Sequence, residues 1–407
     1  MFIGATRFSI FQPSSHAWNL TKNAGRGTPD ELKSVLYSPH RIEPRLDIFL
    51  NFSLPIIAKA AEHHFIRHVV MYSEEMPKQY KERLEEAAAR WDFLVLNKHV
   101  DGKSDETVPG PHMIAKKYLG DEGTYGIYRL DDDDLLSESF FSRAERFIKP
   151  AFAGMRLSFA SGVTGFYENG EFSYLKTCYH PMIAIGLLNI CHRVDAHNII
   201  QPSDAPHIYS DRYDPVILDS EEPMYFWTRH CNQDTNVADE GDSRASILKE
   251  LNSRPSFGGT EKAIELFPTL EGNLRPINFK PIVQNAMEIG ASPVSLAVEV
   301  NSSTFEVKLE VEAPLGTVSR AGLVSFQFED SEGMPVKAKD VVIEGLTSSP
   351  NDAIGWYKYL QTDAGRVWQT FTVGVESGHR LSQITVMQFG KNSRDFTVHN
   401  IQIGSVE

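Results

Sequence analysis

The chain has 407 residues, of which 41% are hydrophobic and 23% are charged, a composition that predicts a globular protein of two domains. Its formal net charge of −14 argues against nucleic-acid binding or attachment to a membrane surface through charge alone. A membrane-spanning helix needs about 20 apolar residues, and the best apolar run, HPMIAIGLLNIC (180–191), is shorter and contains His, Gly and Asn.

The N-terminus and the cysteines predict a compartment. The opening stretch MFIGATRFSIFQ lacks the basic start and small-residue cleavage site of a secretory signal. Cys178, Cys191 and Cys231 are an odd number without close spacing, which predicts reduced thiols and neither a disulfide framework nor a zinc site. We therefore expect a cytoplasmic protein.

The first half of the chain alternates strand-like and helix-like segments. Stretches rich in β-branched and aromatic residues predict strands, and apolar residues at helical spacing predict helices. The expected strands are 1–11, 66–73, 92–99 and 124–130; the expected helices are 46–62 with a kink at Pro55, 76–91, 112–119 and 135–148. This alternation predicts an α/β domain with a mostly parallel sheet over residues 1–270.

The second half has a different pattern. Residues 155–178 predict strands with a hairpin at ENGE, and the polar, proline-containing stretch 204–244 predicts loops. Residues 271–291 have the proline and glycine density of a connector. From 292 to 407, short alternating strands separated by turns predict an all-β sandwich or jelly roll.

Four consecutive aspartates, Asp131 to Asp134, lie between the expected strand 124–130 and the expected helix 135–148. Ligands of open α/β sheets bind at the carboxyl ends of the strands, which is where this tetrad is expected. Asp131 and Asp133 are two residues apart, so in an extended segment they face the same way. Such carboxylates suit Mg²⁺ or Mn²⁺, which can hold a diphosphate leaving group. The alternative is a solvated acidic turn.

Motifs in the N-terminal part resemble a known family. TYGIYRLDDDDLL is similar to the DxD signature of GT-A glycosyltransferases. IGATRFSIFQ, AWN, SPHRIEPRLDIFLNFSLPII and MYSEEMPKQYKERL, in this order, resemble the family named as putative rhamnosyltransferases. The resemblance implies a GT-A-like, Rossmann-like domain that binds a nucleotide sugar.

The resemblance also implies roles for individual residues. Asp131 would face the nucleotide ribose or the waters of the metal, and Asp133 would bind the cation. Asp132 and Asp134 could exchange with these roles, because four consecutive aspartates leave the register open, so Asp131, Asp133 and Asp134 are all candidate metal ligands. Thr6 and Arg7 end the first strand, where GT-A folds hold the nucleotide; the alternative for Arg7 is a surface ion pair. His230 is a candidate further metal ligand, against a structural role. The candidate bases for an inverting enzyme are Asp204, Asp211 and Asp234.

Two arginines and four aromatic residues complete the candidate set. The guanidinium groups of Arg41 and Arg45 match phosphate in a bidentate way; the alternative is a pair of solvated charges beside a helix. Trp356, Tyr357, Tyr359 and Trp368 in the β-domain could stack on sugar rings or fill the core. Core is favoured for Trp368. Trp356 and Tyr357 are consecutive, so they face opposite sides of a strand.

These observations predict a metal-dependent glycosyltransferase that moves a sugar, with rhamnose as the candidate, from a nucleotide-sugar donor to a glycan or lipid-linked glycan acceptor. The β-domain would bind carbohydrate or mediate assembly, and a homo-oligomer is left open. One alternative is a non-catalytic glycan-binding or scaffold protein with a decayed transferase domain. Another is a Mg²⁺-dependent phosphohydrolase, although DDDDLL lacks the threonine of a D-x-D-x-T motif.

Overall fold

A computed structural model describes residues 1–11, 28–100, 107–233, 243–302, 304–375, 378–390 and 394–405. They belong to two compact units. Unit 1 comprises Met1–Arg244 and Phe257–Leu274, and unit 2 comprises Ala245–Ser256 and Arg275–Glu407. Among the described residues, no helix combines the length and the apolar character needed to cross a membrane.

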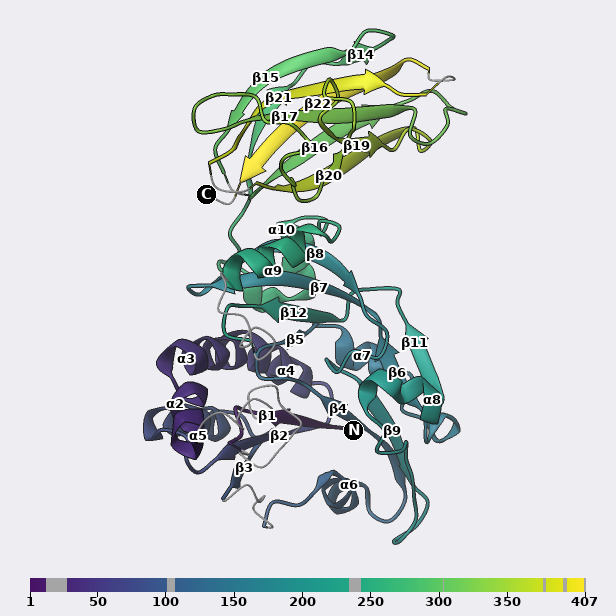
Figure 1. The fold of residues 1–407 in the computed structure, drawn as a ribbon. Coiled ribbons are helices and arrows are strands. Elements are labelled where there is room, and N and C mark those ends of the chain that lie inside the picture. The colour runs from purple at the N-terminus through teal and green to yellow at the C-terminus, as the bar shows by residue number, and fades with distance from the viewer. Residues whose placement is uncertain are drawn as a thin grey trace. The chain divides into compact units, whose positions relative to one another are not determined.

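Unit 1 is built on a mixed eight-stranded sheet with the order β11-β6-β9-β4-β1-β2-β3, with β10 paired to β9 (Figure 1). Strands β1 to β4 run parallel to one another, and β9 is antiparallel to β4. The carboxyl ends of β1 to β4 therefore meet at one edge. The strands are β1 (Phe2–Arg7), β2 (Ile66–Ser73), β3 (Leu94–His99), β4 (Gly123–Arg129), β6 (Arg156–Phe159), β9 (Leu188–Arg193), β10 (Ile199–Ile200) and β11 (Val216–Asp219).

Helices cover both faces of the parallel part of this sheet. One face packs its apolar side chains, such as Phe2 and Val70, against α2 (Pro29–Leu36), α3 (Pro39–Asp47), α4 (Leu54–Ala61) and α5 (Lys78–Arg90). The other face, with Ile3 and Val69, packs against Ile114 and Ala115 of α6 (Pro111–Leu119). The sheet core is thus closed on both sides, as the alternating sequence pattern predicts.

A π-helical segment, η2 (Ile48–Ser53), joins α3 to α4 where a kinked helix was expected. Pro55 lies in the first turn of α4, where its missing N–H costs no helical hydrogen bond. A proline ring also clashes with the carbonyl four residues earlier, and widening the helix into a π turn relieves such a clash. The expected disturbance at Pro55 therefore takes the form of a π segment just before it.

A smaller sheet follows the aspartate tetrad. Its order is β5-β12-β7-β8, with β5 (Leu135–Leu136), β12 (Tyr225–Arg229), β7 (Ser161–Glu168) and β8 (Glu171–Tyr179). The helix expected over 135–148 is shorter than predicted, because Leu135 and Leu136 pair with β12 and α7 spans only Phe140–Glu145. The remaining short helices of unit 1 are η3 (Pro150–Phe152), η4 (His207–Tyr209), α8 (Ser210–Tyr213), α10 (Thr260–Leu266) and η6 (Pro268–Leu270).

Unit 2 contains two five-stranded antiparallel sheets. Side chains from both sheets, among them Val307, Phe326, Ile384 and Ile401, form one hydrophobic cluster. One sheet has β13 (Asn278–Val283), β22 (Phe396–Ser405), β16 (Thr304–Glu312) and β20 (Arg366–Gly374), with β14 (Met287–Ile289) paired to β22. The other has β15 (Val294–Val300), β21 (Arg380–Gln388), β17 (Gly322–Glu329), β19 (Trp356–Leu360) and β18 (Thr347–Ser348). The more specific description as a jelly roll stays a prediction.

Two segments before residue 292 belong to unit 2. Of the stretch 271–291, expected as a connector, the part from Arg275 onward belongs to unit 2 and contains β13 and β14, which pair with β22. Helix α9 (Ser243–Asn252) belongs to unit 2 from Ala245 onward. Lys249 of this helix pairs with Glu344 at 3.0 Å, and Ser256, which follows the helix, donates a hydrogen bond to Glu306 at 2.7 Å.

The aromatic residues of unit 2 correct one expectation. Trp368 was expected in the core but is 45% exposed, because its position on β20 faces outward, where Lys308 lies over its ring at 4.9 Å. Trp356 is the core residue: it is 1% exposed and packs edge-on against Phe328. Tyr357, next to it, points to the opposite side of β19, as strand geometry requires.

A buried polar network ties the three central strands of unit 1 together. His68 on β2 hydrogen-bonds through Nε2 to Thr6 Oγ1 (2.9 Å) and through Nδ1 to Tyr128 Oη (2.8 Å). Thr6 in turn donates to the carbonyl of Leu130 (2.7 Å). Burial lowers the pKa of His68 to about 3, so the ring is neutral at pH 7. Gly4 leaves room for this network, since a Cβ there would lie 2.1 Å from His68 Nδ1.

We expect Gly4→Ala to lower the free energy of unfolding by about 3 kcal/mol, because the added methyl overlaps His68 and Tyr128 in a packed core. Chemical denaturation measures this. Gly258→Ala is the matched control, since nothing lies within 4 Å of a Cβ at that position. Equal stability of the two variants would contradict the close packing described for β1.

Candidate active site at the carboxyl edge of the first sheet

The tetrad links the two sheets of unit 1. β4 ends at Arg129, and the Leu130 N–H donates to the carbonyl of Ala5 (3.1 Å), which keeps the chain beside β1. Asp131 to Asp134 then turn the backbone toward β5. The structure thus places the four carboxylates at the carboxyl edge of the parallel strands, where the sequence predicted them.

Arg45 neutralises the centre of the tetrad. It lies on α3, is 6% exposed, and its Nη1 contacts both Asp132 Oδ1 and Asp133 Oδ2, the latter at 3.0 Å. Arg41, one helical turn earlier and equally buried, donates to Ser9 Oγ (3.1 Å). Neither arginine is a solvated surface charge. Removing two adjacent carboxylates from water is costly unless a cation and hydrogen bonds compensate them, which is the role that Arg45 plays.

The backbone after β1 is shaped to reach Asp132. Ser9 has a φ of 42°, which is unusual for a residue with a side chain and costs about 1–2 kcal/mol. In this conformation its N–H donates to Asp132 Oδ2 (3.1 Å). Asp132 therefore accepts from both Arg45 and Ser9, so its carboxylate joins β1, α3 and the acidic turn. Burial raises its pKa, an effect that Arg45 opposes.

Asp133 and His230 form a buried pair. His230 follows β12 directly, is 2% exposed, and its Nε2 lies 3.1 Å from Asp133 Oδ2. Its Nδ1 accepts from the backbone N–H of Asn232 (3.3 Å), so Nε2 carries the proton and donates to Asp133. Burial on its own raises the pKa of Asp133, but Arg45 and His230 together hold it well below its usual range. Burial lowers the pKa of His230.

The remaining two aspartates differ sharply in environment. Asp134 accepts from the Thr228 N–H (3.0 Å), and burial together with the charges of Asp133 and Asp131 raises its pKa well above its usual value. Asp131 is at the rim, 35% exposed, and pairs with Arg129 (2.8 Å). Three effects therefore relieve the repulsion within the tetrad. Arg129 pairs with Asp131 at the rim, Arg45 pairs with Asp133 at the centre, and the raised pKa of Asp134 favours its neutral form.

Two polar residues at the ends of β2 and β3 were not predicted as functional. His99 ends β3 and is 6% exposed, and neither ring nitrogen has a hydrogen-bond partner within the part of the chain that the structure describes. Burial and the charge of nearby Arg7 lower its pKa. Ser73 ends β2 and accepts from the Phe11 N–H (2.8 Å). Their positions, last in a parallel strand, are the signal by which the sequence could have identified them.

Thr6 has a structural role in the geometry. Its hydroxyl is fully buried, donates to the carbonyl of Leu130 and hydrogen-bonds His68, so it is not directed at a ligand site. Arg7 fits the predicted place beside the nucleotide better, because it is exposed at the end of β1. It is close enough to Arg129 and Asp131 for their charges to affect its pKa.

The described side chains do not by themselves form a cation site. Within the described ranges, no three side chains of His, Cys, Asp or Glu gather closely enough to hold a metal ion. Asp131, Asp133 and Asp134 each point to a different partner. His230 directs a protonated nitrogen at Asp133, whereas a metal ligand needs the lone pair of that nitrogen. The predicted set of Asp131, Asp133, Asp134 and His230 is thus only in part brought together, as the Asp133–His230 pair.

Two of the three candidate bases have no described contact with the tetrad. Asp204 is close enough to His112 for its charge to affect the pKa of that ring, and His112 hydrogen-bonds Tyr125 near the start of β4. Asp211 lies on α8, three residues before Asp214, which pairs with Arg156 of β6. Asp234 lies outside the described residues.

Sequence comparison decides the family. The family model described as putative rhamnosyl transferase matches residues 1–241, more than half of the chain. The chain belongs to this family. The match includes the tetrad, Arg45 and His230, so the whole buried cluster falls within the family region. No curated protein matches the chain.

Solved structures show only distant likeness. A CBM22-1 xylan-binding domain from Paenibacillus barcinonensis Xyn10C has 14% identity and a TM-score of 0.20, and the match covers 32% of this chain and 82% of that domain. A putative glucose-1-phosphate thymidylyltransferase from Bacillus anthracis has 8% identity and a TM-score of 0.26, with 60% of this chain and 98% of that chain covered. Likeness at this level carries no argument about fold or function.

We expect Arg45→Met to lower the free energy of unfolding by about 3–5 kcal/mol, because it leaves Asp132 and Asp133 buried beside each other without their cation. Adding Asp132→Asn to this variant should recover part of the loss. Arg129→Met is the control: its partner Asp131 is half-exposed, so the expected cost is within about 1 kcal/mol. Similar losses for Arg45→Met and Arg129→Met in urea denaturation would contradict the central role of Arg45.

Proposed function

We infer that this protein is a glycosyltransferase of the GT-A type that moves a sugar from a nucleotide-sugar donor to a glycan acceptor. The observation that carries this proposal is the Asp133–His230–Arg45 cluster at the carboxyl edge of β1 to β4, in a chain of the putative rhamnosyl transferase family. Family membership supports glycosyl transfer. Rhamnose as the sugar, a lipid-linked or surface polysaccharide as the acceptor, and a cytoplasmic location stay proposals.

The rim of the site suits the leaving group of such a reaction. Transfer breaks the bond between the sugar and the donor diphosphate, so negative charge grows on the phosphate oxygens. Arg7 and Arg129 lie at the ends of β1 and β4, and cations placed there stabilise that charge. Asp133, held ionised by Arg45 and His230, places a fixed negative charge below the rim, which stabilises positive charge that develops on the sugar ring.

A divalent cation would bind together with the donor, whose phosphates would supply part of its ligands. Magnesium in proteins is often held by one or two carboxylates together with substrate phosphates. Asp133 and the rim carboxylate Asp131 are the residues that could contribute here. When bound, Mg²⁺ or Mn²⁺ would supply Lewis-acid stabilisation of the leaving diphosphate.

We expect Asp133→Asn to reduce transfer by about 10²-fold or more, because the amide keeps the shape of the side chain and removes the charge. The measurement is release of nucleoside diphosphate from a panel of dTDP-, UDP- and GDP-sugars with a glycan acceptor mixture. Asp121→Asn is the control, since Asp121 is an exposed carboxylate whose partner is Lys116 on α6. Undiminished release by Asp133→Asn would remove the tetrad from the mechanism.

We expect Mn²⁺ alone to change the melting temperature very little, because the described side chains do not form a cation site without further ligands. Mn²⁺ added together with the donor should raise the melting temperature above the value with donor alone, and EDTA should remove that increment. A rise of several degrees with Mn²⁺ alone would mean that a complete metal site exists without the donor. An identical donor effect in EDTA would count against a metal requirement.

A further inference from the structure

His99 is a buried imidazole at the carboxyl edge of the first sheet. It is the last residue of β3 and is 6% exposed. Neither Nδ1 nor Nε2 makes a hydrogen bond to another residue in the part of the chain that the structure describes. Buried side-chain nitrogens normally have a partner, because burial without one is unfavourable. A ligand that binds at this edge would supply the missing partner.

Two arginines lie on the same face and at the same edge of the sheet as His99. Arg7 ends β1 and Arg129 ends β4. Their faces follow from the register pairs, which are Ala5 with Arg129, Arg7 with Met71, and Met71 with Asn97. Because side chains two residues apart on a strand share a face, His99 lies on the face of Asn97 and therefore on that of both arginines. This is the face that packs against α6.

The order of the strands places these three groups in a line. β4, β1, β2 and β3 are neighbours in this order, so the arginines lie at one end of the line and His99 at the other. The spacing of neighbouring strands puts the ends of β1 and β3 about 10 Å apart, with the end of β2 between them. A nucleotide whose phosphates lie at the arginines would therefore have its ribose over β2 and its base beside His99.

The charge state of His99 fits a base better than a phosphate. Burial and the positive charge of Arg7 lower the pKa of His99, so the ring is neutral at pH 7. A neutral imidazole has one N–H donor and one acceptor nitrogen. The edge of a nucleobase likewise carries donors and acceptors and no charge. Phosphate oxygens prefer cations, which Arg7 and Arg129 supply.

We propose that His99 hydrogen-bonds the base of the nucleotide-sugar donor and contributes to the choice of nucleotide, whereas Arg7 and Arg129 bind the phosphates. The inference rests on the proposed transferase function, because it requires a nucleotide at this edge of the sheet. It does not depend on a divalent cation. The contact replaces no hydrogen bond that His99 makes to another described residue, so the whole of its hydrogen-bonding capacity is available to the base.

The test compares probes with and without a base. Calorimetry on the full chain, with Mg²⁺ in the buffer, measures the binding of UDP, dTDP, GDP and pyrophosphate. His99→Phe keeps a planar ring and removes both nitrogens. We expect this variant to bind the tightest of the three nucleotides about tenfold more weakly, through loss of a hydrogen bond to the base, and to bind pyrophosphate unchanged.

A second variant and the melting temperature separate a binding role from a structural one. His99→Gln keeps a donor and an acceptor in a different geometry, so it should recover part of the affinity and change the order of affinity among the three nucleotides. His99→Phe should melt at or above the temperature of the unaltered protein, because it removes buried nitrogens that have no partner. His379→Phe is the matched control, since His379 Nδ1 in unit 2 also lacks a described partner.

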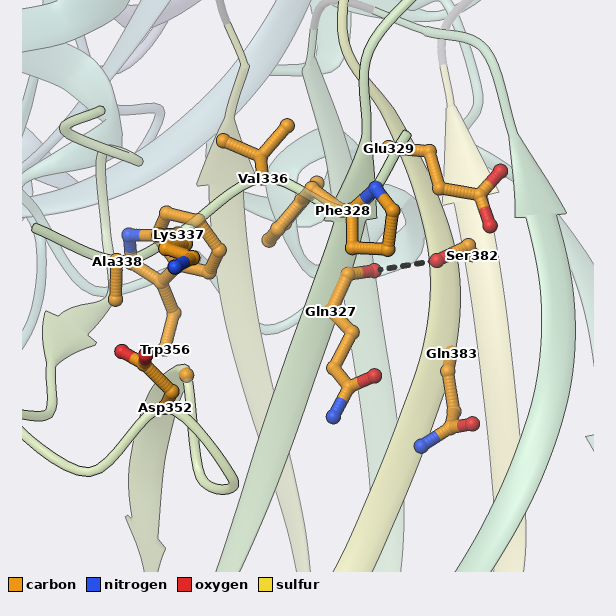
Figure 2. Close-up of a pocket in the computed structure, with 12 residues that line it drawn as sticks. Gln327, Phe328, Glu329, Val336, Lys337, Ala338, Asp352, Trp356, Ser382 and Gln383 are labelled. Carbon is orange, nitrogen blue, oxygen red and sulfur yellow. Dashed lines mark hydrogen bonds between the residues drawn. The ribbon is translucent and has the colours of Figure 1, made fainter. Parts of the chain in front are cut away.

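Unit 2 contains another place where a nucleotide could bind, a cavity of about 300 Å³ beside β19 (Figure 2). Gln383→Ala changes the lining of that cavity and should leave nucleotide binding unchanged. The inference is overturned if nucleotide binding is unaffected in both His99 variants, if pyrophosphate binding falls as much as nucleotide binding, or if Gln383→Ala or His379→Phe causes the same loss. If none of the three nucleotides binds the unaltered protein, the proposed function itself fails, and this inference fails with it.

Discussion

The contact of one guanidinium group with two neighbouring carboxylates determines the arrangement of the candidate active site. Arg45 reaches Asp132 and Asp133 from α3 and lets an acidic turn be buried at the end of β4. Without a cation, adjacent ionised carboxylates in that position would repel each other and lose their hydration. The left-handed backbone at Ser9 serves the same requirement, because it lets the Ser9 N–H donate to Asp132, and the buried Arg41 donates to the Ser9 hydroxyl.

The site also lies where the chain leaves one sheet and enters another. The acidic turn ends β4 of the large sheet and starts β5 of the small one, and His230 follows β12, the partner of β5. Side chains at such a junction are positioned by two rigid sheets but lie on irregular backbone, where ligands can approach. This explains how a carboxylate and an imidazole 97 residues apart in the sequence become neighbours.

Local sequence pattern predicted the elements more reliably than their partners. The parallel strands, the helices 76–91 and 112–119 and the position of the tetrad follow from periodicity and turn residues, which act over a few residues. The pairing of Arg45 with Asp132 spans 87 residues, and the periodicity of the sequence does not predict it. Leu135 and Leu136 were assigned to a helix because their spacing fits one, but pairing with β12 overrides that preference.

The burial of the two tryptophans of unit 2 could not be predicted from local pattern either. Alternation along a strand predicts that neighbours face opposite sides, as Trp356 and Tyr357 do. It does not predict which side another sheet covers. The burial of Trp356 and the exposure of Trp368 depend on which face of each strand meets the common hydrophobic cluster, a property of the assembled sheets.

The chain passes between the two units three times, since Ala245–Ser256 belongs to unit 2 and Phe257–Leu274 returns to unit 1. Unit 2 is therefore not a cassette appended to the end of a transferase. A break after Leu274 would leave helix α9 on the fragment that carries the candidate active site and would separate the Lys249–Glu344 and Ser256–Glu306 partners. The β-fragment would then lack helix α9, so a division that keeps unit 2 whole must also cut the chain on both sides of Ala245–Ser256.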